Sequence, residues 1–360
     1  MTTPEPVPLW LYGGSGLLAG ELLRLLEAHP ALQLAAAVSR KAEKADAEAL
    51  HPHLASRPAP AAVEDAQKAL ETQLARGGRA AVVFALPHGQ AAAAWSALRA
   101  RLGAAAERVA VVDLSADYRL RDPQRFAATY GGPHGDLSEL PQFVYGLPEL
   151  HRAKLRGARR VAAPGCFATA MQLAAVPAAR AEVLDAKAPW ILYGITGSSG
   201  SGAEPKPGTH HPYRNNNFWA YSLDGHRHEA ELEQALEEYG VRAPLHFVAH
   251  SAPLTRGIHL TAALPLARPL TTAQARAIYT EIFSGEPFVE VLESGVPEIR
   301  RVAGSNRACL GVSVRGSVLH VLVAIDNIVK GGSGQALQCL NLMLGFPETW
   351  GLPRSGLGVC

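Results

Sequence analysis

Cysteine, aromatic residues and an excess of either charge are all scarce in this sequence. Its 360 residues include 4 cysteines, aromatic residues make up 6%, and 34 basic residues nearly balance 32 acidic ones, for a net charge of +2. Four distant cysteines without a CxxC pair fit neither a disulfide scaffold nor a zinc module, so we expect a reducing, cytoplasmic setting. A charge balance this even lacks the excess of basic residues that is typical of nucleic-acid-binding proteins.

Long apolar runs are missing too. The apolar runs, such as 321–325, are far shorter than the ~18 residues that a membrane-spanning helix needs. The N-terminus lacks the basic and apolar segments of a signal peptide, so we expect no membrane association. Hydrophobic residues nevertheless make up 48% of the chain, enough for a substantial core. At roughly 150 residues per domain, the length predicts two domains, or three.

The first part of the chain alternates apolar strands with a helix-like pattern. Continuous apolar runs are typical of parallel strands that helices cover on both faces, and the opening strand–turn–helix–strand unit predicts an α/β fold that begins with a doubly wound parallel sheet. The expected strands are 8–13, 32–38, 80–86 and 109–115, and the expected helices are 17–28 and 90–102.

The rest of the chain predicts further helices and strands around two irregular stretches. We expect an irregular connection over 122–148 and a long loop over 197–217, which at that length is functional or disordered. The expected helices start at Cys166, after His228 and at 333, and the expected strands are 190–196, 245–252, 257–266 and 318–325.

A glycine-rich turn joins the first strand to the first helix. Gly13, Gly14, Gly16 and Gly20 follow a Gly-x-x-Gly-x-x-x-Gly spacing, which differs from the GxGxxG fingerprint. Glycines let the backbone approach a pyrophosphate, whose charge meets the amides at the helix N-terminus. The alternative is a plain glycine-rich turn, but the strand–turn–helix context favours nucleotide binding.

Basic residues end the second strand, as Ser39-Arg40-Lys41. An NAD site would have an acidic residue here for the ribose 2′-hydroxyl, whereas cations suit the 2′-phosphate of NADP. Taken alone, these could be two solvated surface cations. With the glycine turn upstream, we predict NADP.

Cys166 follows a Pro-Gly turn and begins an expected helix. Unpaired amides at a helix N-terminus stabilise a thiolate, so this position suits a nucleophile, although most cysteines are small buried apolar residues. We assign that plainer role to Cys309, Cys339 and Cys360. A thiolate beside a nicotinamide implies attack on an activated acyl carbon, followed by hydride reduction of the thioester to an aldehyde.

Two histidines lie close together in Gly225-His226-Arg227-His228. Either imidazole could move protons near neutral pH. A strand-like segment would place His226 and His228 on one face, whereas a helix would separate them. His210-His211 upstream allows a zinc site, but no acidic or cysteine ligand stands at a typical spacing, so we predict no metal. A solvated polar helix start is the plainer interpretation of this segment.

Two arginines are candidates for holding an anionic substrate. Arg119 follows a buried strand at the end where parallel sheets collect binding groups, and Arg256 lies in Thr255-Arg-Gly-Ile258. Each could instead be a structural ion-pair partner.

Together these motifs closely resemble one family, N-acetyl-gamma-glutamyl-phosphate reductase of arginine biosynthesis. The resemblance covers nearly the whole chain. Its motifs are Gly13-Gly-Ser-Gly-Leu-Leu-Ala-Gly20, Ala85-Leu-Pro-His-Gly89, Asp113-Leu-Ser-Ala-Asp-Tyr-Arg119, Pro164-Gly-Cys166, Gly225-His-Arg-His228, Thr255-Arg-Gly-Ile258, Ala324-Ile-Asp-Asn-Ile-Val-Lys-Gly331 and Pro347-Glu-Thr349.

The resemblance implies an oxidoreductase of amino-acid biosynthesis that reduces an acyl phosphate to a semialdehyde with NADPH, releasing phosphate. It implies Cys166 as nucleophile and His226 as acid/base, with the substrate near Arg119, His228, Glu231 and Arg256. The implied cofactor contacts are Gly13, Ser15, Gly16, Leu17, Leu18, Ser39, Arg40, Lys41 and Asn327.

The resemblance also implies a division of the chain. A Rossmann domain over 1–165 is completed by the C-terminal helix and tail, 333–360, while 166–332 forms a catalytic and oligomerisation domain. The implied assembly is a homodimer or homotetramer.

The chain departs from the usual family pattern at two tyrosine positions and in one loop. Leu17 and Phe167-Ala168 replace a Tyr and a Tyr-Pro, and the loop over 198–217 is more similar to the related lysine-biosynthesis reductase. That enzyme acts on aminoadipyl phosphate attached to a carrier protein, so an acidic carrier partner is the alternative. Aspartate-semialdehyde dehydrogenase fits the histidine segment less well. Two further hypotheses are a catalytically silent NADP-binding regulator and a zinc hydrolase.

Overall fold

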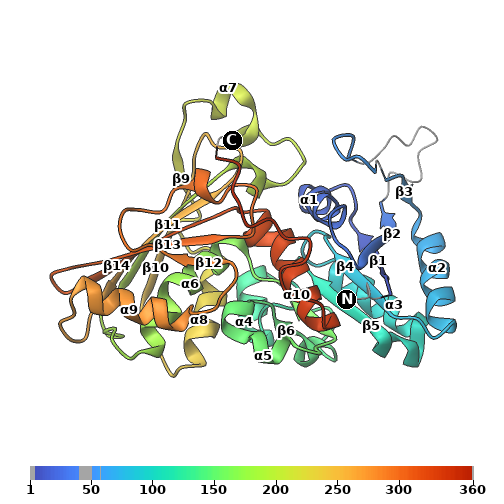
Figure 1. Cartoon of the computed structure of the whole chain (residues 1–360), viewed down its shortest axis with the longest axis horizontal. Coiled ribbons are helices and arrows are strands. Elements are labelled where there is room, and N and C mark those ends of the chain that lie inside the picture. Colours follow the sequence, from blue (N-terminus) through green and yellow to red (C-terminus); the bar gives the residue numbers. More distant parts are fainter. Residues whose placement is uncertain (1–4, 40–50, 57, 359–360) are drawn as a thin grey trace. The chain divides into compact units, whose positions relative to one another are not determined.

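A computed structural model describes residues 5–39, 51–56 and 58–358, which form two compact units (Figure 1). The first unit comprises Met1–Pro164 and Gly332–Leu352, and the second comprises Gly165–Gly331 and Pro353–Cys360. We expected the whole C-terminal segment in the first unit. The residues from Pro353 onward instead group with the second, because the backbone N–H of Leu357 donates to the Ala303 carbonyl at 2.9 Å.

The first unit is built on a seven-stranded sheet in which every pairing is parallel. The strand order is β3-β2-β1-β4-β5-β7-β6. Every residue of the central strand β4 is buried, so both faces of the sheet are covered. The strands are β1 (Val7–Tyr12), β2 (Leu32–Val38), β3 (Pro60–Ala61), β4 (Ala80–Phe84), β5 (Val109–Asp113), β6 (Val144–Tyr145) and β7 (Arg160–Ala162).

Helices cover this sheet in the manner of a doubly wound fold. Trp95 and Leu70 belong to the core cluster that packs α3 and α2 against Phe84, while α1 and α10 contact each other and the sheet. The predicted Rossmann-type architecture is therefore confirmed. The helices are α1 (Leu17–Leu26), α2 (Val63–Ala75), α3 (Ala91–Leu102), α4 (Pro123–Tyr130), α5 (Pro148–Leu155) and α10 (Gly334–Leu344).

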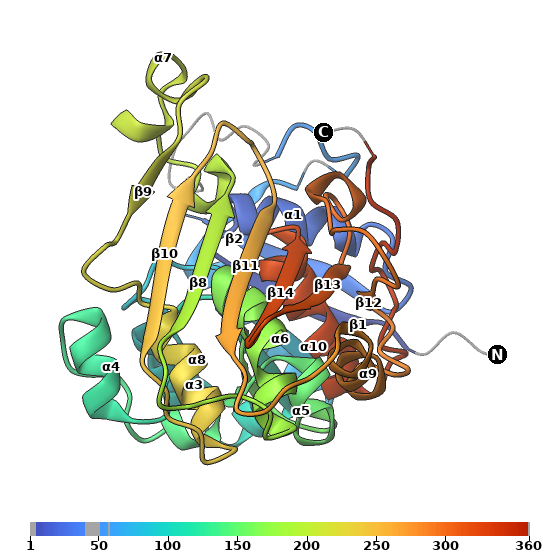
Figure 2. The same cartoon turned by 90° about the vertical axis from the view of Figure 1, so that its left-hand side faces the viewer.

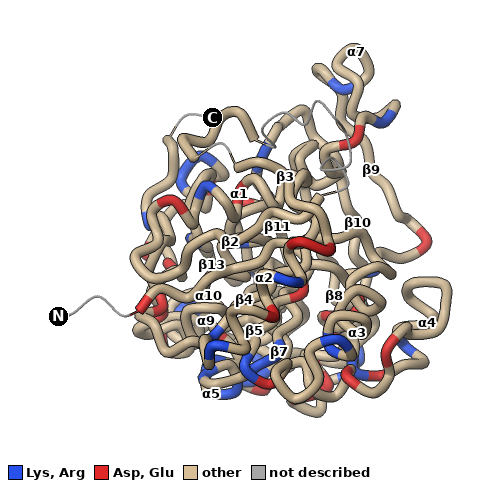
Figure 3. The backbone as a smooth tube through the Cα atoms, turned by 90° about the vertical axis from the view of Figure 1, so that its right-hand side faces the viewer, with Lys and Arg blue, Asp and Glu red and all other residues tan. Residues whose placement is uncertain are grey.

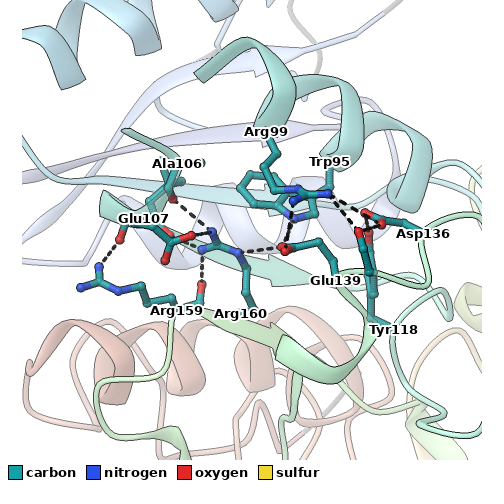
Figure 4. Close-up of polar contacts among 11 residues, drawn as sticks. Trp95, Arg99, Ala106, Glu107, Tyr118, Asp136, Glu139, Arg159 and Arg160 are labelled. Atoms are coloured by element: carbon teal, nitrogen blue, oxygen red, sulfur yellow. Dashed lines mark hydrogen bonds and ion pairs between the residues drawn. The ribbon is translucent and has the colours of Figure 1, made fainter. Parts of the chain in front are cut away.

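A buried arginine at the start of β7 fastens this short strand to its neighbours (Figure 4). The Arg160 guanidinium lies 4.4 Å from the centre of the Trp95 ring and donates to the Val109 and Ala106 carbonyls at 2.8 and 3.1 Å. Glu139 accepts a 2.8 Å hydrogen bond from Trp95 Nε1 and lies 3.4 Å from Arg160 Nε. Because β7 has only three residues, this network fixes where it begins.

The second unit contains a mixed seven-stranded sheet of order β12-β13-β14-β11-β8-β10-β9. The β12–β13 and β8–β10 pairs are parallel and the others antiparallel. Its strands are β8 (Trp190–Thr196), β9 (Trp219–Tyr221), β10 (Leu245–Ser251), β11 (Ile258–Pro265), β12 (Val289–Val291), β13 (Ala308–Arg315) and β14 (Val318–Ile325).

Helix α6 is the centre of the second unit. Its residues from Phe167 to Ala179 are all buried, as expected for a helix that is apolar all round. Figure 2 shows β10, β8, β11 and β14 in front with α6 and α8 behind them, while α9 lies to the right and contacts β13 and β12. Along β8 and β11 buried residues alternate with more exposed ones, and Tyr193 is 48% exposed. The helices are α6 (Cys166–Arg180), α7 (His211–Arg214), α8 (Glu229–Glu237) and α9 (Thr272–Ile282).

The expected irregular connection over 122–148 is partly wrong, because α4 lies inside it. Asp122 caps this helix by accepting the Gln124 N–H at 2.9 Å, and Pro123 occupies the first turn, where a proline costs no hydrogen bond. The expected loop over 197–217 likewise contains α7 and two short 3₁₀ turns.

Basic and acidic residues are interspersed along the backbone, as the colours of Figure 3 show around α3 and α5. Arg101 of α3, for example, pairs with Glu64 and Glu71 of α2. Among the described residues, no helix is both long and apolar enough to cross a lipid bilayer.

Candidate active site

The glycine turn of the first unit has the geometry of an anion-binding site. Gly13 has φ +85°, and a Cβ on it would lie 2.4 Å from the Ala85 carbonyl oxygen, so only glycine fits. The N–H groups of Gly13 and Gly14 donate to the Val38 carbonyl, which ties the turn to β2. Gly16 is then the N-cap of α1 and, having no side chain, makes no side-chain cap hydrogen bond. Ser15 lies in the turn, whereas Leu17 and Leu18 are the first two residues of α1, and amides at a helix N-terminus are suited to bind an anion.

His51 supports this turn and was not anticipated from the sequence. Its Nε2 lies 2.7 Å from the Gly14 carbonyl oxygen and must donate, since a carbonyl can only accept. A Cβ on Gly20 would lie 2.7 Å from His51 Nδ1, so the last glycine of the motif makes room for the ring.

The predicted NADP-selective residues follow β2. Ser39 is buried and its N–H donates to the Ala61 carbonyl at 3.2 Å. Arg40 and Lys41 lie outside the described residues.

Cys166 is the first residue of α6, as predicted, and the residue is partly buried. The preceding residue, Gly165, is the N-cap and has no side chain that could accept a hydrogen bond from the first backbone amides. Cys166 therefore lies at the N-terminus of a 15-residue helix, where the helix dipole favours negative charge. Across from it lies Gly331, on which a Cβ would come within 2.7 Å of the Cys166 Cβ. Cys309 and Cys339 are buried, in keeping with the plainer role assigned to them.

Two side chains of the histidine segment hold the backbone beside the cysteine. Glu231 is 0% exposed, and its Oε2 accepts the Gly165 N–H at 3.0 Å. The His228 ring covers Gly165, where a Cβ would lie 2.3 Å from its Nε2. The structure thus places His228 and Glu231 against Gly165, the residue before Cys166, and the Glu231 hydrogen bond holds that backbone in position.

His226 and His228 lie in a turn before α8, with ring centres 4.6 Å apart. The centres of Phe167, Tyr221 and Phe247 lie 5.6, 6.0 and 5.3 Å from that of His226. Burial among these rings, and to a smaller extent the Arg227 charge, lowers the pKa of His226 to about 4. Burial and the nearby Cys166 raise the pKa of Tyr221.

Asp326 organises a second cluster in the same unit and was not singled out from the sequence. Its buried carboxylate accepts the N–H groups of Ile328, Val329 and Gly304 and pairs with Arg256 Nε at 3.0 Å. Its backbone carbonyl accepts the Gly331 N–H at 2.8 Å. Asp326 therefore connects the candidate substrate anchor Arg256 to the residue that faces Cys166.

Asn327 is tied into the same cluster. Its Oδ1 accepts the Gly257 N–H at 2.7 Å, and its Nδ2 donates to Ser199 Oγ at 2.9 Å. These bonds link the Arg256 loop to the start of the long 197–217 loop.

Arg119 lies in the first unit and is buried. Its Nε and Nη2 donate to the carbonyls of Ala163 and Leu114 at 2.8 and 3.0 Å. These bonds hold the end of the β7 segment against the loop after β5.

The described residues offer no set of side chains that could bind zinc. Across residues 5–39, 51–56 and 58–358, no group of three or more His, Cys, Asp or Glu side chains is arranged to hold a metal ion. The His211 side chain is exposed, and that of His210 is also open to solvent.

Comparisons with known proteins agree with this division of the chain. Residues 10–158 match the family described as semialdehyde dehydrogenase, NAD binding domain, and residues 166–327 match the semialdehyde dehydrogenase dimerisation domain. N-acetyl-gamma-glutamyl-phosphate reductase of Methanocella arvoryzae is 39% identical, with 96% of this chain and 98% of that protein covered. The chain belongs to the N-acetyl-gamma-glutamyl-phosphate reductase family.

Other relatives agree with this family and its fold. The same-named protein of Azotobacter vinelandii is 38% identical over 96% of this chain and 98% of its own. A Thermomicrobium roseum protein, provisionally named LysW-L-2-aminoadipate 6-phosphate reductase, is 39% identical over 98% and 99%. Aspartate semialdehyde dehydrogenase II of Vibrio cholerae shares the fold, with a TM-score of 0.66, 15% identity, and 95% of this chain and 99% of that chain covered.

Members of the N-acetyl-gamma-glutamyl-phosphate reductase family are semialdehyde dehydrogenases, and this chain is an oxidoreductase of that class. It carries a nicotinamide-binding domain and a dimerisation domain.

Proposed function

We propose that this enzyme reduces N-acetyl-glutamyl 5-phosphate to N-acetyl-glutamate 5-semialdehyde and phosphate with NADPH, a step of arginine biosynthesis. The observation that carries the proposal is the position of Cys166: a partly buried cysteine at the first position of a buried helix whose N-cap, Gly165, has no side chain, with Glu231 accepting the Gly165 N–H. A reducing, cytoplasmic compartment suits a nucleophile that must remain a free thiol.

The proposed reaction has two stages. The Cys166 thiolate attacks the acyl carbon, and the bond from that carbon to the phosphate oxygen breaks, releasing phosphate and leaving a thioester. When bound, the reduced nicotinamide supplies a hydride. Breakage of the carbon–sulfur bond of the reduced thioester would release the aldehyde and regenerate the Cys166 thiolate. His226 serves as the acid/base of these steps.

We assign the cofactor and substrate contacts as follows. Gly13, Ser15, Gly16, Leu17 and Leu18 would hold the pyrophosphate, because the uncapped amides of α1 suit an anion. Ser39, Arg40 and Lys41 would favour the 2′-phosphate and so NADPH. Arg256, with Arg119 and His228, would attract the anionic substrate, while Asn327 would meet the nicotinamide portion.

The experiment is phosphate-dependent reduction of NADP⁺ in the reverse direction. Free N-acetyl-glutamate semialdehyde is compared with carrier-bound aminoadipate semialdehyde. We expect activity on the free acetylated substrate. Activity only on the carrier-bound one would assign the enzyme to the reaction named for the Thermomicrobium roseum relative, with an acidic carrier as its partner.

We also propose that a second copy covers the open face of the second sheet. Tyr193 of β8 is 48% exposed there, and its cross-strand neighbours Val248 and Thr261 are only partly buried, which leaves an apolar face for a partner. The match to a dimerisation domain over these strands supports a homodimer or homotetramer. Light scattering after size-exclusion chromatography gives the subunit count, and Tyr193→Asp should shift the assembly toward monomer.

A further inference from the structure

We propose that His51 is a positioning residue for the dinucleotide: by holding the carbonyl of Gly14, it orients the backbone N–H of Ser15 toward the pyrophosphate. The inference rests on the dinucleotide role of the first unit, which matches a nicotinamide-binding family over 10–158, and not on the identity of the acyl substrate. It deepens the proposed function by adding to the cofactor site a residue that lies outside the glycine motif.

Gly14 is held at both of its backbone polar groups. Its N–H donates to the Val38 carbonyl at 2.8 Å, and its carbonyl oxygen lies 2.7 Å from His51 Nε2. Because a carbonyl can only accept, Nε2 carries a proton and donates it. Gly14 and His51 are both buried, so the imidazole, rather than bulk water, satisfies this carbonyl.

The hydrogen bond to the Gly14 carbonyl also fixes the direction of the next amide. That carbonyl and the Ser15 N–H belong to one planar trans peptide, in which the two groups point in opposite directions. With the carbonyl directed at His51, the Ser15 N–H is directed away from the imidazole. Within residues 5–39, 51–56 and 58–358, no hydrogen bond engages this N–H, and Ser15 is only partly buried.

Ser15 is the residue of the turn whose amide is left for a ligand. The N–H groups of Gly13 and Gly14 donate to the Val38 carbonyl, and that of Gly16 donates to the Gly13 carbonyl at 3.2 Å. Without His51, the peptide between Gly14 and Ser15 could rotate, because a glycine restrains its own backbone least of all residues. Rotation would replace an N–H donor with the negative end of a carbonyl dipole, which repels phosphate.

Contacts with α1 hold the His51 ring in place. A Cβ on Gly20 would lie 2.7 Å from His51 Nδ1 and 2.8 Å from its Cε1, so the ring packs directly on the helix backbone. The Leu54 N–H donates to the His51 carbonyl at 3.0 Å, and the Ser56 N–H donates to Glu27 Oε1 at 2.8 Å. The segment that carries His51 is therefore fastened to α1 at Gly20 and again at the residue that ends the helix.

The dissociation constant of NADP⁺, measured by calorimetry on the full-length protein, tests the proposal without reference to turnover. We expect His51→Ala to raise this Kd roughly tenfold, the effect of losing one oriented donor to a charged group. His51→Gln should stay within about threefold of wild type, because its side-chain amide nitrogen can take the place of Nε2. The matched control is His53→Ala, an exposed imidazole whose ring centre lies 5.8 Å from that of His51, and it should bind like wild type.

Gly20→Ala reaches the same loss by an independent route. The added methyl group would displace the ring without altering His51, so the Kd of NADP⁺ should rise in this variant too. In the double variant with His51→Ala the two effects should not add, since the ring that the methyl group displaces is already absent. A Kd for His51→Ala within about twofold of wild type, equal losses in His51→Ala and His51→Gln, or additive losses in the double variant would each overturn the proposal.

Steady-state kinetics separate positioning of the cofactor from a general loss of structure. In His51→Ala the KM for NADPH should rise, while kcat at saturating NADPH and the KM for the acyl substrate change little. A fall in kcat with an unchanged KM for NADPH would contradict the inference. If His51→Ala does not fold, His51→Gln and Gly20→Ala still provide the comparison.

Failure of the cofactor assignment would be distinguishable from failure of this inference. Tighter binding of NAD⁺ than of NADP⁺ by the wild type would refute the proposed preference for NADPH. The same variants titrated with NAD⁺ would then still test His51, because both dinucleotides carry the pyrophosphate.

Discussion

Gly331 and Cys166 lie so close together that a methyl group on the glycine would sit 2.7 Å from the cysteine Cβ and 3.1 Å from its Cα. The Gly331 N–H is held by the Asp326 carbonyl, so the glycine cannot easily retreat. The nucleophile is thus positioned by a residue from the opposite end of the second unit's sequence.

Gly331→Ala should therefore displace Cys166 and lower kcat. We expect a loss of tenfold or more, of the order that a misplacement of about 1 Å causes, together with a changed rate of alkylation by iodoacetamide. Gly132→Ala is the matched control, because a Cβ there meets nothing within 4 Å. Equal kinetics in the two variants would argue against a steric role for Gly331.

Cys166→Ser should abolish reduction and spare nucleotide binding. Removing a nucleophile costs roughly a thousandfold or more in kcat, whereas the glycine turn is built from other residues. Steady-state assays and NADPH fluorescence titration measure the two effects. Cys309→Ala, which removes a buried thiol elsewhere in the same unit, should remain active. Near-normal turnover of Cys166→Ser would rule out the thioester.

The enzyme should strongly prefer NADPH to NADH, and Arg40→Ser/Lys41→Ser should weaken that preference. Hydrogen bonds to charged groups contribute roughly 1.5–3 kcal/mol, so the ratio of kcat/KM values should fall by about tenfold or more. Lys68→Ser on the exposed face of α2 controls for net charge. Equal use of both cofactors by the wild type would refute the assignment of the cation pair.

Asp113 should make stability depend on pH. Burial, and secondarily the Asp117 charge, raises the pKa of Asp113 to about 7. The folded state thus binds this proton more tightly than the unfolded chain, and the contribution to stability declines as pH rises from about 4 to 7. Asp113→Asn should lose less unfolding free energy than wild type between pH 5 and 8, measured by urea denaturation. The exposed Asp224→Asn should behave like wild type, and the same slope in Asp113→Asn would contradict the prediction.

Local features could be predicted well from the sequence. The glycine turn and the start of α6 at Cys166 depend on neighbouring residues, and the structure places both as expected. Helix α4 was not predicted because Asp122-Pro123 is typical of a turn in an irregular segment. The same pair also begins helices when apolar residues at helical spacing follow it.

Contacts between distant segments could not be predicted. Nothing near Gly331 in the sequence indicates that it faces Cys166, and the Asp326–Arg256 pair depends on three loops meeting. For His226 and His228 both a strand and a helix remained open, and the structure shows a turn instead. Arg119 illustrates the same limit, since its bonds to Ala163 and Leu114 use backbone atoms that no side-chain pattern reveals.

Loss of the Arg160 side chain should produce a conditional growth defect. One guanidinium joins Trp95, Val109 and Ala106, and its own strand is only three residues long. Removing it would take a hydrogen-bond donor from the Val109 and Ala106 carbonyls and the cation from the Trp95 ring, while every proposed active-site residue would remain in the sequence. An Arg160→Ala allele should thus be temperature-sensitive: cells that depend on the enzyme would grow at low temperature and fail when warmed.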